Sequence, residues 1–353
     1  MIVGALLRHT VLRRVTTLIL LALFTAVATP VLLLALLIGG LVMLRPHGRG
    51  RLARFAAFAL AYLAAEIVGL SRMLWLWIFA SPRGDARRRA RYENAHYALL
   101  DRLLGLLWKV ARRAFRIRVL PPEQHGQLPD GPLLVFSRHA GPGDSFLLVY
   151  ALLDVIRRRP RVVLKSTLTL DPFIDFVLSH TPNCFVGPGD RDREQAIEGI
   201  ADLSGSLGPH DALLIFPEGG NFTVARRSKL IERLRQKRAW RLLPAARSLE
   251  HVLPPQPAGT FAAIDAAVPG ATVVFVAHTG LDVLESVADV WHAVPLDGPL
   301  EIAWWTCPVD QIPHEKAERE AWLSARWSRI DEWIDARRPR SAASGRRTGP
   351  RDG

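Results

Sequence analysis

The N-terminal part of the sequence contains two long apolar runs. The first, residues 15–44, has no charged residue, and about twenty helical residues already cover a hydrocarbon core of roughly 30 Å. The second, residues 55–80, carries Glu66 and Arg72, which are costly at mid-depth in a bilayer. The pattern predicts two N-terminal membrane helices, either a spanning hairpin or a shallower pair inserted in one leaflet.

Arginines flank both apolar runs. Three precede the first run, four lie within residues 45–54, and a further group lies within residues 83–91. Weighed by the positive-inside rule, this distribution places both ends of the pair, and the domain that follows, on the cytoplasmic side of the cell membrane. The alternative is a cleaved signal peptide ending near Ala28. Its apolar core would stop near the cleavage site, whereas here it continues to residue 44.

Farther along the chain, short β-prone runs alternate with segments of helical periodicity. The runs are predicted as buried strands and the intervening segments as helices. This alternation predicts an α/β fold in which a sheet is covered by helices. The predicted strands are 133–136, 161–164, 184–186, 212–216, 272–277 and 300–305, and the predicted helices are 145–156, 192–207, 224–240 and 315–336.

These patterns divide the chain into four parts. Residues 1–82 are predicted to form the membrane anchor, residues 83–118 a basic helical connector, and residues 119–336 the α/β domain. The last part, residues 337–353, contains mainly Arg, Ser, Gly and Pro and has no apolar run. We therefore expect it to be a disordered basic tail.

The composition is strongly basic, which indicates an anionic partner. The chain has 46 Lys and Arg against 33 Asp and Glu, a formal net charge of +13. Lipid headgroups, nucleic acid and phosphorylated substrates all satisfy such a charge, but the spacing of basic and aromatic residues shows no nucleic-acid-binding module. Two cysteines, Cys184 and Cys307, exclude a disulfide framework and lack the spacing of a zinc site.

A histidine and an aspartate flank a glycine-rich turn directly after the first predicted strand. Residues 137–145 read SRHAGPGDS, and Asp144 or Ser145 can cap the helix that follows. Such a turn can fold the Asp144 carboxylate back to accept a hydrogen bond from one ring nitrogen of His139. A histidine held in this way can act as a general base toward a hydroxyl. The same spacing also fits a turn histidine beside a simple helix cap.

A second motif follows the predicted strand at 212–216. Residues 216–223 read FPEGGNFT, so that Glu218 lies at a strand exit beside Gly219, whose lack of a side chain lets a ligand approach the backbone closely. In a parallel sheet, the ends of both strands face the same crevice. Taken alone, Glu218 fits an ordinary turn residue equally well.

Together the two motifs resemble the lysophospholipid acyltransferase family, typified by 1-acylglycerol-3-phosphate acyltransferase. The family signature is N-H-x-x-x-x-D followed downstream by F-P-E-G, and this chain has Arg138, His139 and Asp144 and then residues 216–219. An intermediate block and a later hydrophobic run into proline extend the resemblance over residues 133–333. The stretch 300–333 is most similar to the lysocardiolipin acyltransferase branch.

The resemblance implies acyl transfer from acyl-CoA or acyl carrier protein to the free hydroxyl of a lysophospholipid. The first choice of acceptor is 1-acyl-sn-glycerol-3-phosphate, which would give phosphatidic acid. No metal or cofactor is implied, and the expected partners are the acyl donor, the lysophospholipid and membrane lipids, without nucleic acid. The implied catalytic residues are His139 and Asp144, and the implied substrate-binding residues are Glu218, Gly219, Arg191, Arg193 and Lys165.

One departure from the family pattern leaves the acceptor open. The family often has Thr-Arg after F-P-E-G, whereas this chain has Gly220 and Asn221, so one phosphate-binding arginine is absent. Lys165, Arg226 or an arginine at 191 or 193 can compensate, or the acceptor carries a phosphodiester of lower charge.

Three other functions remain as alternatives. The first is an acyltransferase that acts on another lysophospholipid. The second is a metal-dependent phosphoesterase with His139, Asp144 and Glu218 as ligands. The third is a non-catalytic lipid-binding protein that uses its basic face. The sequence contains no phosphate-binding P-loop, H-E-x-x-H helix or G-x-S-x-G elbow, which removes the main support for kinase, zinc-protease and α/β-hydrolase activities.

Overall fold

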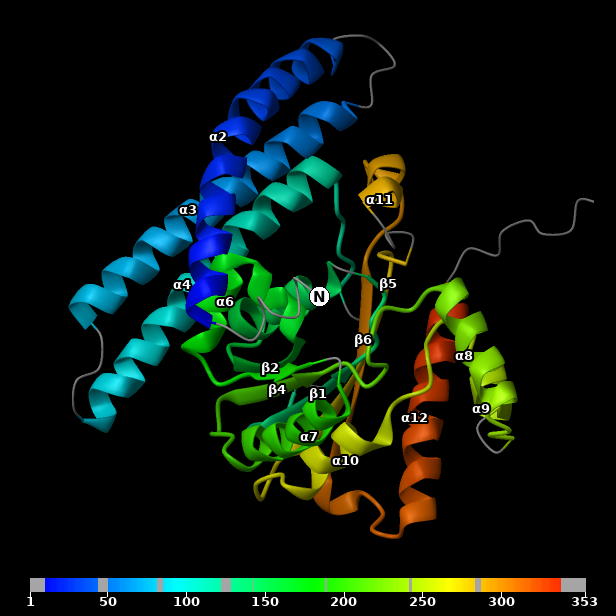
Figure 1. The fold of residues 1–353 in the computed structure, drawn as a ribbon. Coiled ribbons are helices and arrows are strands. Elements are labelled where there is room, and N and C mark those ends of the chain that lie inside the picture. The colour runs from blue at the N-terminus through cyan, green and yellow to red at the C-terminus, as the bar shows by residue number, and fades with distance from the viewer. Residues whose placement is uncertain are drawn as a thin grey trace, which may run out of the picture.

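The computed structural model describes residues 10–43, 50–80, 85–121, 128–141, 143–187, 189–240, 243–282 and 287–337. Within these residues, six strands form one sheet in the order β3-β2-β4-β1-β5-β6 (Figure 1). Neighbours from β3 to β5 pair in parallel, and β6 pairs antiparallel with β5. The strands are β1 (Leu133–Ser137), β2 (Arg159–Lys165), β3 (Cys184–Val186), β4 (Asp211–Ile215), β5 (Thr272–Thr279) and β6 (Glu301–Pro308).

The central strands form because they are covered on both faces. Every residue of β1, β4 and β5 is buried, as expected for parallel strands whose two sides both pack against helices. Leu133 of β1 lies opposite Ala212 of β4 and Thr272 of β5. The predicted α/β fold with a helix-covered sheet is thus confirmed.

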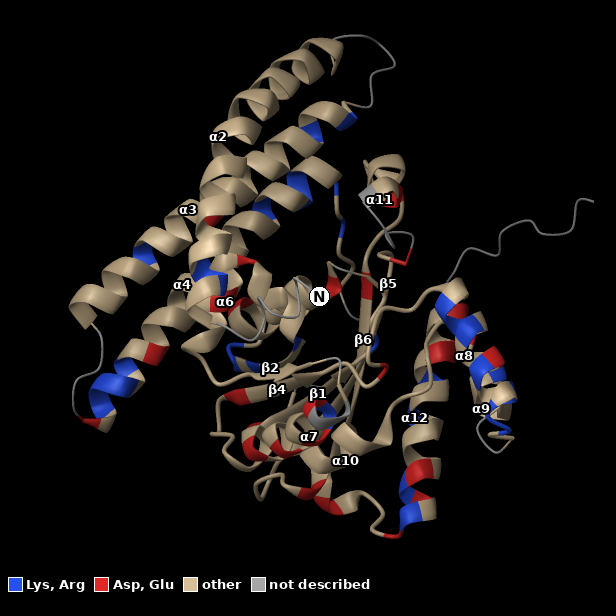
Figure 2. Cartoon of the chain, in the orientation of Figure 1, with Lys and Arg blue, Asp and Glu red and all other residues tan. Residues whose placement is uncertain are grey.

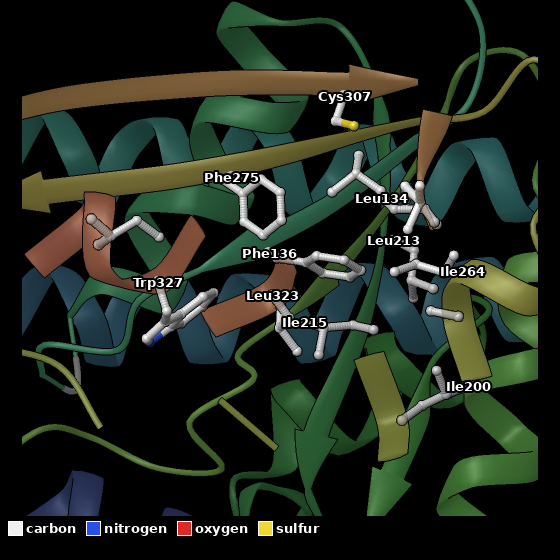
Figure 3. Packing of buried hydrophobic residues seen from close by; sticks show 14 of the residues in the cluster. Leu134, Phe136, Ile200, Leu213, Ile215, Ile264, Phe275, Cys307, Leu323 and Trp327 are labelled. Carbon is white, nitrogen blue, oxygen red and sulfur yellow. The ribbon is translucent and has the colours of Figure 1, made fainter. Parts of the chain in front are cut away.

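Helices cover both faces of the sheet. On one face, Phe136 of β1 and Phe275 of β5 pack edge to face with ring centroids 5.8 Å apart, next to Trp327 (Figure 3). The opposite face is covered by α5 and the π-helical turn that continues it. The helices of the first face are α7 (Asp190–Gly205), α10 (Pro257–Asp265) and α12 (Lys316–Asp335), and those of the second are α5 (Asp144–Tyr150) and the turn Ala151–Val155.

Three long helices pack side by side outside this second face (Figure 1). A short helix later in the chain, after β2, packs against two of them. Gly69 allows the close approach, because a Cβ built there would lie 2.5 Å from the Phe173 ring. The long helices are α2 (Thr10–Met43), α3 (Arg51–Ala80) and α4 (Ala86–Phe115), and the short one is α6 (Pro172–Ser179). The other α-helices of the described residues are α8 (Val224–Gln236), α9 (Leu243–Ser248) and α11 (Val287–Ala293).

The helices α2 and α3 expose much of their apolar surface. Both are long and apolar enough to cross a membrane, and large apolar side chains such as Phe24, Val27, Trp77 and Phe79 lie exposed on them. Figure 2 shows α2 almost free of charge along its length. The pair is therefore suited to contact lipid along one side while α3 packs against α4 on the other.

The beginning of α2 is held against α6 by ion pairs. Arg13 Nη2 and Arg14 Nε each donate to a carboxylate oxygen of Asp175 in α6 at 2.9 Å. The helix continues without interruption past Ala28. A chain cut at the alternative signal-peptide site would lose both arginines and leave Asp175 without them. Apart from Arg337, the predicted basic tail lies outside the described residues.

Candidate active site

The predicted site residues meet at the carboxyl edge of the sheet. Because β1, β2 and β4 run in parallel, the residues that follow or end them, His139, Lys165 and Phe216, come to the same edge. They line one cavity of about 710 Å³ together with Arg193 and Gly219. The remaining walls are mostly apolar and include residues of α3, α4, α5, α6, α7 and α10.

His139 and Asp144 form the expected pair across the turn. Nδ1 of His139 lies 3.0 Å from Asp144 Oδ2, which also accepts the N–H groups of Ala140 at 2.6 Å and Gly141 at 3.2 Å. Asp144 is fully buried at the start of α5. Burial favours its neutral form, but the hydrogen bond from His139 and the two nearby imidazoles outweigh burial, so that the pKa of Asp144 lies below its ordinary value.

The other side of the His139 ring belongs to the cavity. The ring stacks on Phe216 with centroids 4.4 Å apart and an interplanar angle of 30°. The side chain remains 14% exposed, although its aspartate is completely enclosed. With Nδ1 directed at Asp144, Nε2 is the nitrogen that a group bound in the cavity can reach.

Glu218 lies beside His139, but its carboxylate binds main chain. One oxygen accepts the N–H of His139 at 3.0 Å and the other accepts the N–H of Leu253 at 2.8 Å. The side chain is buried and is not part of the cavity wall. Burial raises the pKa of Glu218 to about 8, although the Leu253 N–H and the Arg138 charge act in the opposite direction. The geometry makes Glu218 a residue that positions His139.

Of the two neighbouring residues that the resemblance assigned to substrate binding, Gly219 lines the cavity and Glu218 does not. The φ of Gly219, +69°, lies in the left-handed region that favours glycine, and its N–H donates to the Phe216 carbonyl at 3.0 Å. This turn directs the Glu218 side chain inward and leaves the Gly219 and Gly220 backbone on the cavity wall.

A buried charged group behind the pair was not assigned from sequence. Arg138 forms an ion pair with Asp282 at 2.5 Å and donates to the carbonyl oxygens of His278 at 2.8 Å and His251 at 3.1 Å. Nε2 of His278 lies 3.7 Å from Asp144 Oδ2. Burial and the Arg138 charge lower the pKa of His278 to about 4, so that this imidazole is neutral near pH 7. The sequence signal was the histidine near an aspartate at 278–282, after a strand.

Three basic side chains lie on or next to the cavity wall. Lys165 and Arg193 line it, and the Arg226 guanidinium lies against Gly220, where a Cβ would meet Nη1 at 2.3 Å. Burial and the Arg226 charge both lower the pKa of Lys165, so these two cations influence each other. The backbone of Arg191 belongs to α7, and its side chain lies outside the described residues.

The ligand set of a metal-dependent phosphoesterase is not supported at this site. Both Glu218 oxygens and Asp144 Oδ2 already accept main-chain hydrogen bonds. In the described part of the chain, the group with ligand spacing suitable for a metal is Glu250, His251 and Asp335, whose ligand atoms lie within 4.8 Å of one another. None of these three belongs to the cavity wall.

Comparison with known proteins agrees with this geometry. Residues 117–276 match the protein-family model described as Acyltransferase. In fold, the chain is similar to the crystal structure of the 1-acyl-sn-glycerophosphate (LPA) acyltransferase, PlsC, from Thermotoga maritima, at 11% sequence identity and a TM-score of 0.52. That alignment covers 81% of this chain and 98% of the other. No curated protein matches the chain.

Proposed function

We propose that this protein, whose residues 117–276 belong to the Acyltransferase family, transfers a fatty acyl group from acyl-CoA or acyl carrier protein to the free hydroxyl of a lysophospholipid. The observation that carries the proposal is the 3.0 Å contact of His139 Nδ1 with buried Asp144, at the wall of a cavity of about 710 Å³. That cavity is large and apolar enough for acyl chains and has a basic side for a phosphate.

The reaction follows from the position of the ring. Nε2 of His139 removes the proton of the acceptor hydroxyl while its oxygen attacks the thioester carbonyl carbon. The tetrahedral intermediate collapses, the C–S bond breaks, and the imidazolium returns the proton to the leaving thiolate. Asp144 stabilises the imidazolium and fixes the ring. Glu218 and the Arg138–Asp282 pair hold the His139 backbone and the neighbouring loops in place.

The acceptor proposed first is 1-acyl-sn-glycerol-3-phosphate, which gives phosphatidic acid. Lys165 and Arg193 on the cavity wall, with Arg226 beside Gly220, supply the positive charge that a phosphate monoester requires. A lysophospholipid with a phosphodiester would need fewer of these contacts. The lysocardiolipin-type branch stays a prediction from the C-terminal stretch.

The N-terminal helices support a place at the cell membrane. Residues of α3 and α4 line the same cavity as His139, so a lysolipid carried in the bilayer can reach the site along these helices. With the catalytic domain on the cytoplasmic side, the water-soluble donor arrives from the opposite direction.

The test is the His139→Ala variant with matched substrates. Vesicles containing the full chain are incubated with labelled acyl-CoA and a panel of lysophospholipids, and the products are identified by mass spectrometry. Loss of a general base predicts a decrease in turnover of about 10² to 10⁴-fold. His314→Ala, at an exposed histidine, should leave turnover unchanged. Undiminished turnover in His139→Ala would rule out the assignment, and lysolipid binding without turnover in the wild type would favour a non-catalytic binding protein.

A further inference from the structure

The helix α8 lies on the surface directly beside the cavity. Its N-cap is Thr223, whose hydroxyl accepts the Arg226 N–H at 3.1 Å. Residues 219–221, shortly before it, line the cavity. None of its residues is fully buried. Arg227 fixes its inner side by donating to the carbonyl oxygens of Leu249 and Arg247 at 2.5 Å and 2.7 Å.

One side of α8 carries a line of positive charge. Arg226, Lys229, Arg233 and Lys237 are spaced three or four residues apart, which places them on a common face of the helix. All four side chains are exposed. At about 1.5 Å per residue, this α8 stripe extends over about 17 Å. Figure 2 shows α8 as a concentration of Lys and Arg at the edge of the molecule.

The α8 stripe reaches the cavity through Arg226. That guanidinium packs on Gly220, and its charge contributes to lowering the pKa of Lys165 on the cavity wall. Like charges four residues apart destabilise a helix, and the one acid in α8 is Glu232. By contrast, α12 mixes both signs along its length. The repulsion among these like charges destabilises α8 in the free protein, and an acidic partner bound to the helix would relieve it.

We propose that the α8 stripe is the docking surface for an acidic carrier protein that presents the acyl thioester on a flexible phosphodiester-linked arm. The inference rests on the proposed function, of which it names the donor. An acidic helix laid along the stripe would direct its arm past Arg226 and Lys165 to His139. Charge complementarity of this kind raises the association rate and sets orientation.

Two other anionic partners fit the stripe less well. The phosphates of acyl-CoA need cations near the cavity mouth, which Arg226 and Lys165 already provide, and cannot span about 17 Å of helix. A lipid surface is contacted by apolar side chains among the charges. Most of the large exposed apolar side chains lie on α2 and α3, and the two near α8, Val224 and Trp240, lie at its ends and outside the stripe. Figure 1 places α2 and α3 away from α8, on the other side of the catalytic domain.

The experiment compares two charge reversals on the same helix. Lys229→Glu/Arg233→Glu alters the stripe, and Arg235→Glu/Arg238→Glu changes the net charge by the same amount outside it. Steady-state kinetics of the full chain in vesicles are measured with palmitoyl-acyl carrier protein and, separately, with palmitoyl-CoA. We expect the first variant to lose about tenfold or more in kcat/KM for the carrier protein, mainly through KM and with a weaker salt dependence. Its kcat/KM for palmitoyl-CoA and the kinetics of the control should stay within about twofold.

Other results of this experiment would contradict either the docking surface or the proposed function. Equal losses with both donors, or in both variants, would overturn the docking surface. Loss of vesicle binding in the stripe variant alone would assign the stripe to lipid and overturn it as well. If the wild type turns over neither donor, the proposed function fails, and direct titration with palmitoyl-acyl carrier protein still tests docking, because stripe-dependent binding is expected without catalysis. Absence of that binding would overturn the inference.

Discussion

The guanidinium of Arg138 and the carboxylate of Asp282 form an ion pair at 2.5 Å directly behind the His139–Asp144 pair. Arg138 is 1% exposed and also bonds the carbonyl oxygens of His278 and His251. It therefore joins the exits of β1 and β5 to the loop that holds Glu218. The residue preceding the proposed base thus fixes the loops around it, although it does not line the cavity.

We expect Arg138→Met to destabilise the protein strongly. Removing one partner of a buried ion pair leaves the other charge uncompensated, which typically costs about 3–5 kcal/mol in the free energy of unfolding. Urea unfolding in detergent micelles measures the change. Arg235→Met, which removes an exposed contact to Glu232 at 3.8 Å, should cost no more than about 1 kcal/mol. Equal stability of the two variants would contradict a structural role for the Arg138–Asp282 pair.

Asp144→Asn should lower kcat without loss of membrane association. The neutral amide cannot supply the counter-charge of the imidazolium. Its NH2 group, which can only donate, replaces one of the two oxygens that both lie 3.0 Å from His139 Nδ1, so the ring is held less firmly. We expect kcat to decrease about 10² to 10⁴-fold, measured as CoA release. Ser145→Ala, on the cavity wall, keeps the Asp144 carboxylate and removes a neutral 3.4 Å contact to it. It should cost less than about tenfold, since an ordinary hydrogen bond contributes about 0.5–1.5 kcal/mol. Similar losses in both variants would argue against the dyad.

Glu218→Gln should reduce the pH dependence of stability. The pKa of Glu218 is raised from 4.5 to about 8, so the folded state binds this proton more tightly than the unfolded chain does. Its contribution to the free energy of unfolding is full below about pH 4.5 and is lost as pH rises through about 8. Between pH 4.5 and pH 8, we expect the free energy of unfolding to decrease less in Glu218→Gln than in the wild type. Urea unfolding at several pH values measures this difference. Exposed Glu232→Gln should leave the decrease unchanged, and a Glu218→Gln curve parallel to the wild type would refute the assignment.

Sequence patterns predicted the central sheet well because β1 is apolar up to Ser137 and β4 is apolar after Asp211. The strand at 184–186 was predicted with its observed bounds, and the histidine with its aspartate met across the turn as expected. In contrast, nothing in the alternation of residues 300–305 indicated that β6 runs antiparallel. Its direction depends on the connection after β5, and strand periodicity is the same in both directions.

The sequence patterns did not predict the contacts between residues that lie far apart in the chain. The family resemblance implied that Glu218 binds substrate. The left-handed turn at Gly219 instead directs its carboxylate to two main-chain N–H groups. Likewise, Arg13 and Arg14 fitted the flank of a membrane helix, and their partner Asp175 lies more than 160 residues away. Local periodicity carries no information on such pairs.

The ion pairs of Arg13 and Arg14 with Asp175 allow the attachment of α2 to be tested. In Asp175→Asn, the Arg13 guanidinium, whose side chain is 9% exposed, and that of Arg14 lose the carboxylate that holds them against α6. Because a buried arginine without its counter-ion is unfavourable, we expect the beginning of α2 to open more often. Hydrogen exchange of residues 10–20 should become faster, while β1 and β4 keep their protection. Asp265→Asn, which breaks the partly exposed contact to Arg319 at 2.6 Å, should not affect residues 10–20. Unchanged exchange there in Asp175→Asn would mean that apolar packing alone holds α2 in place.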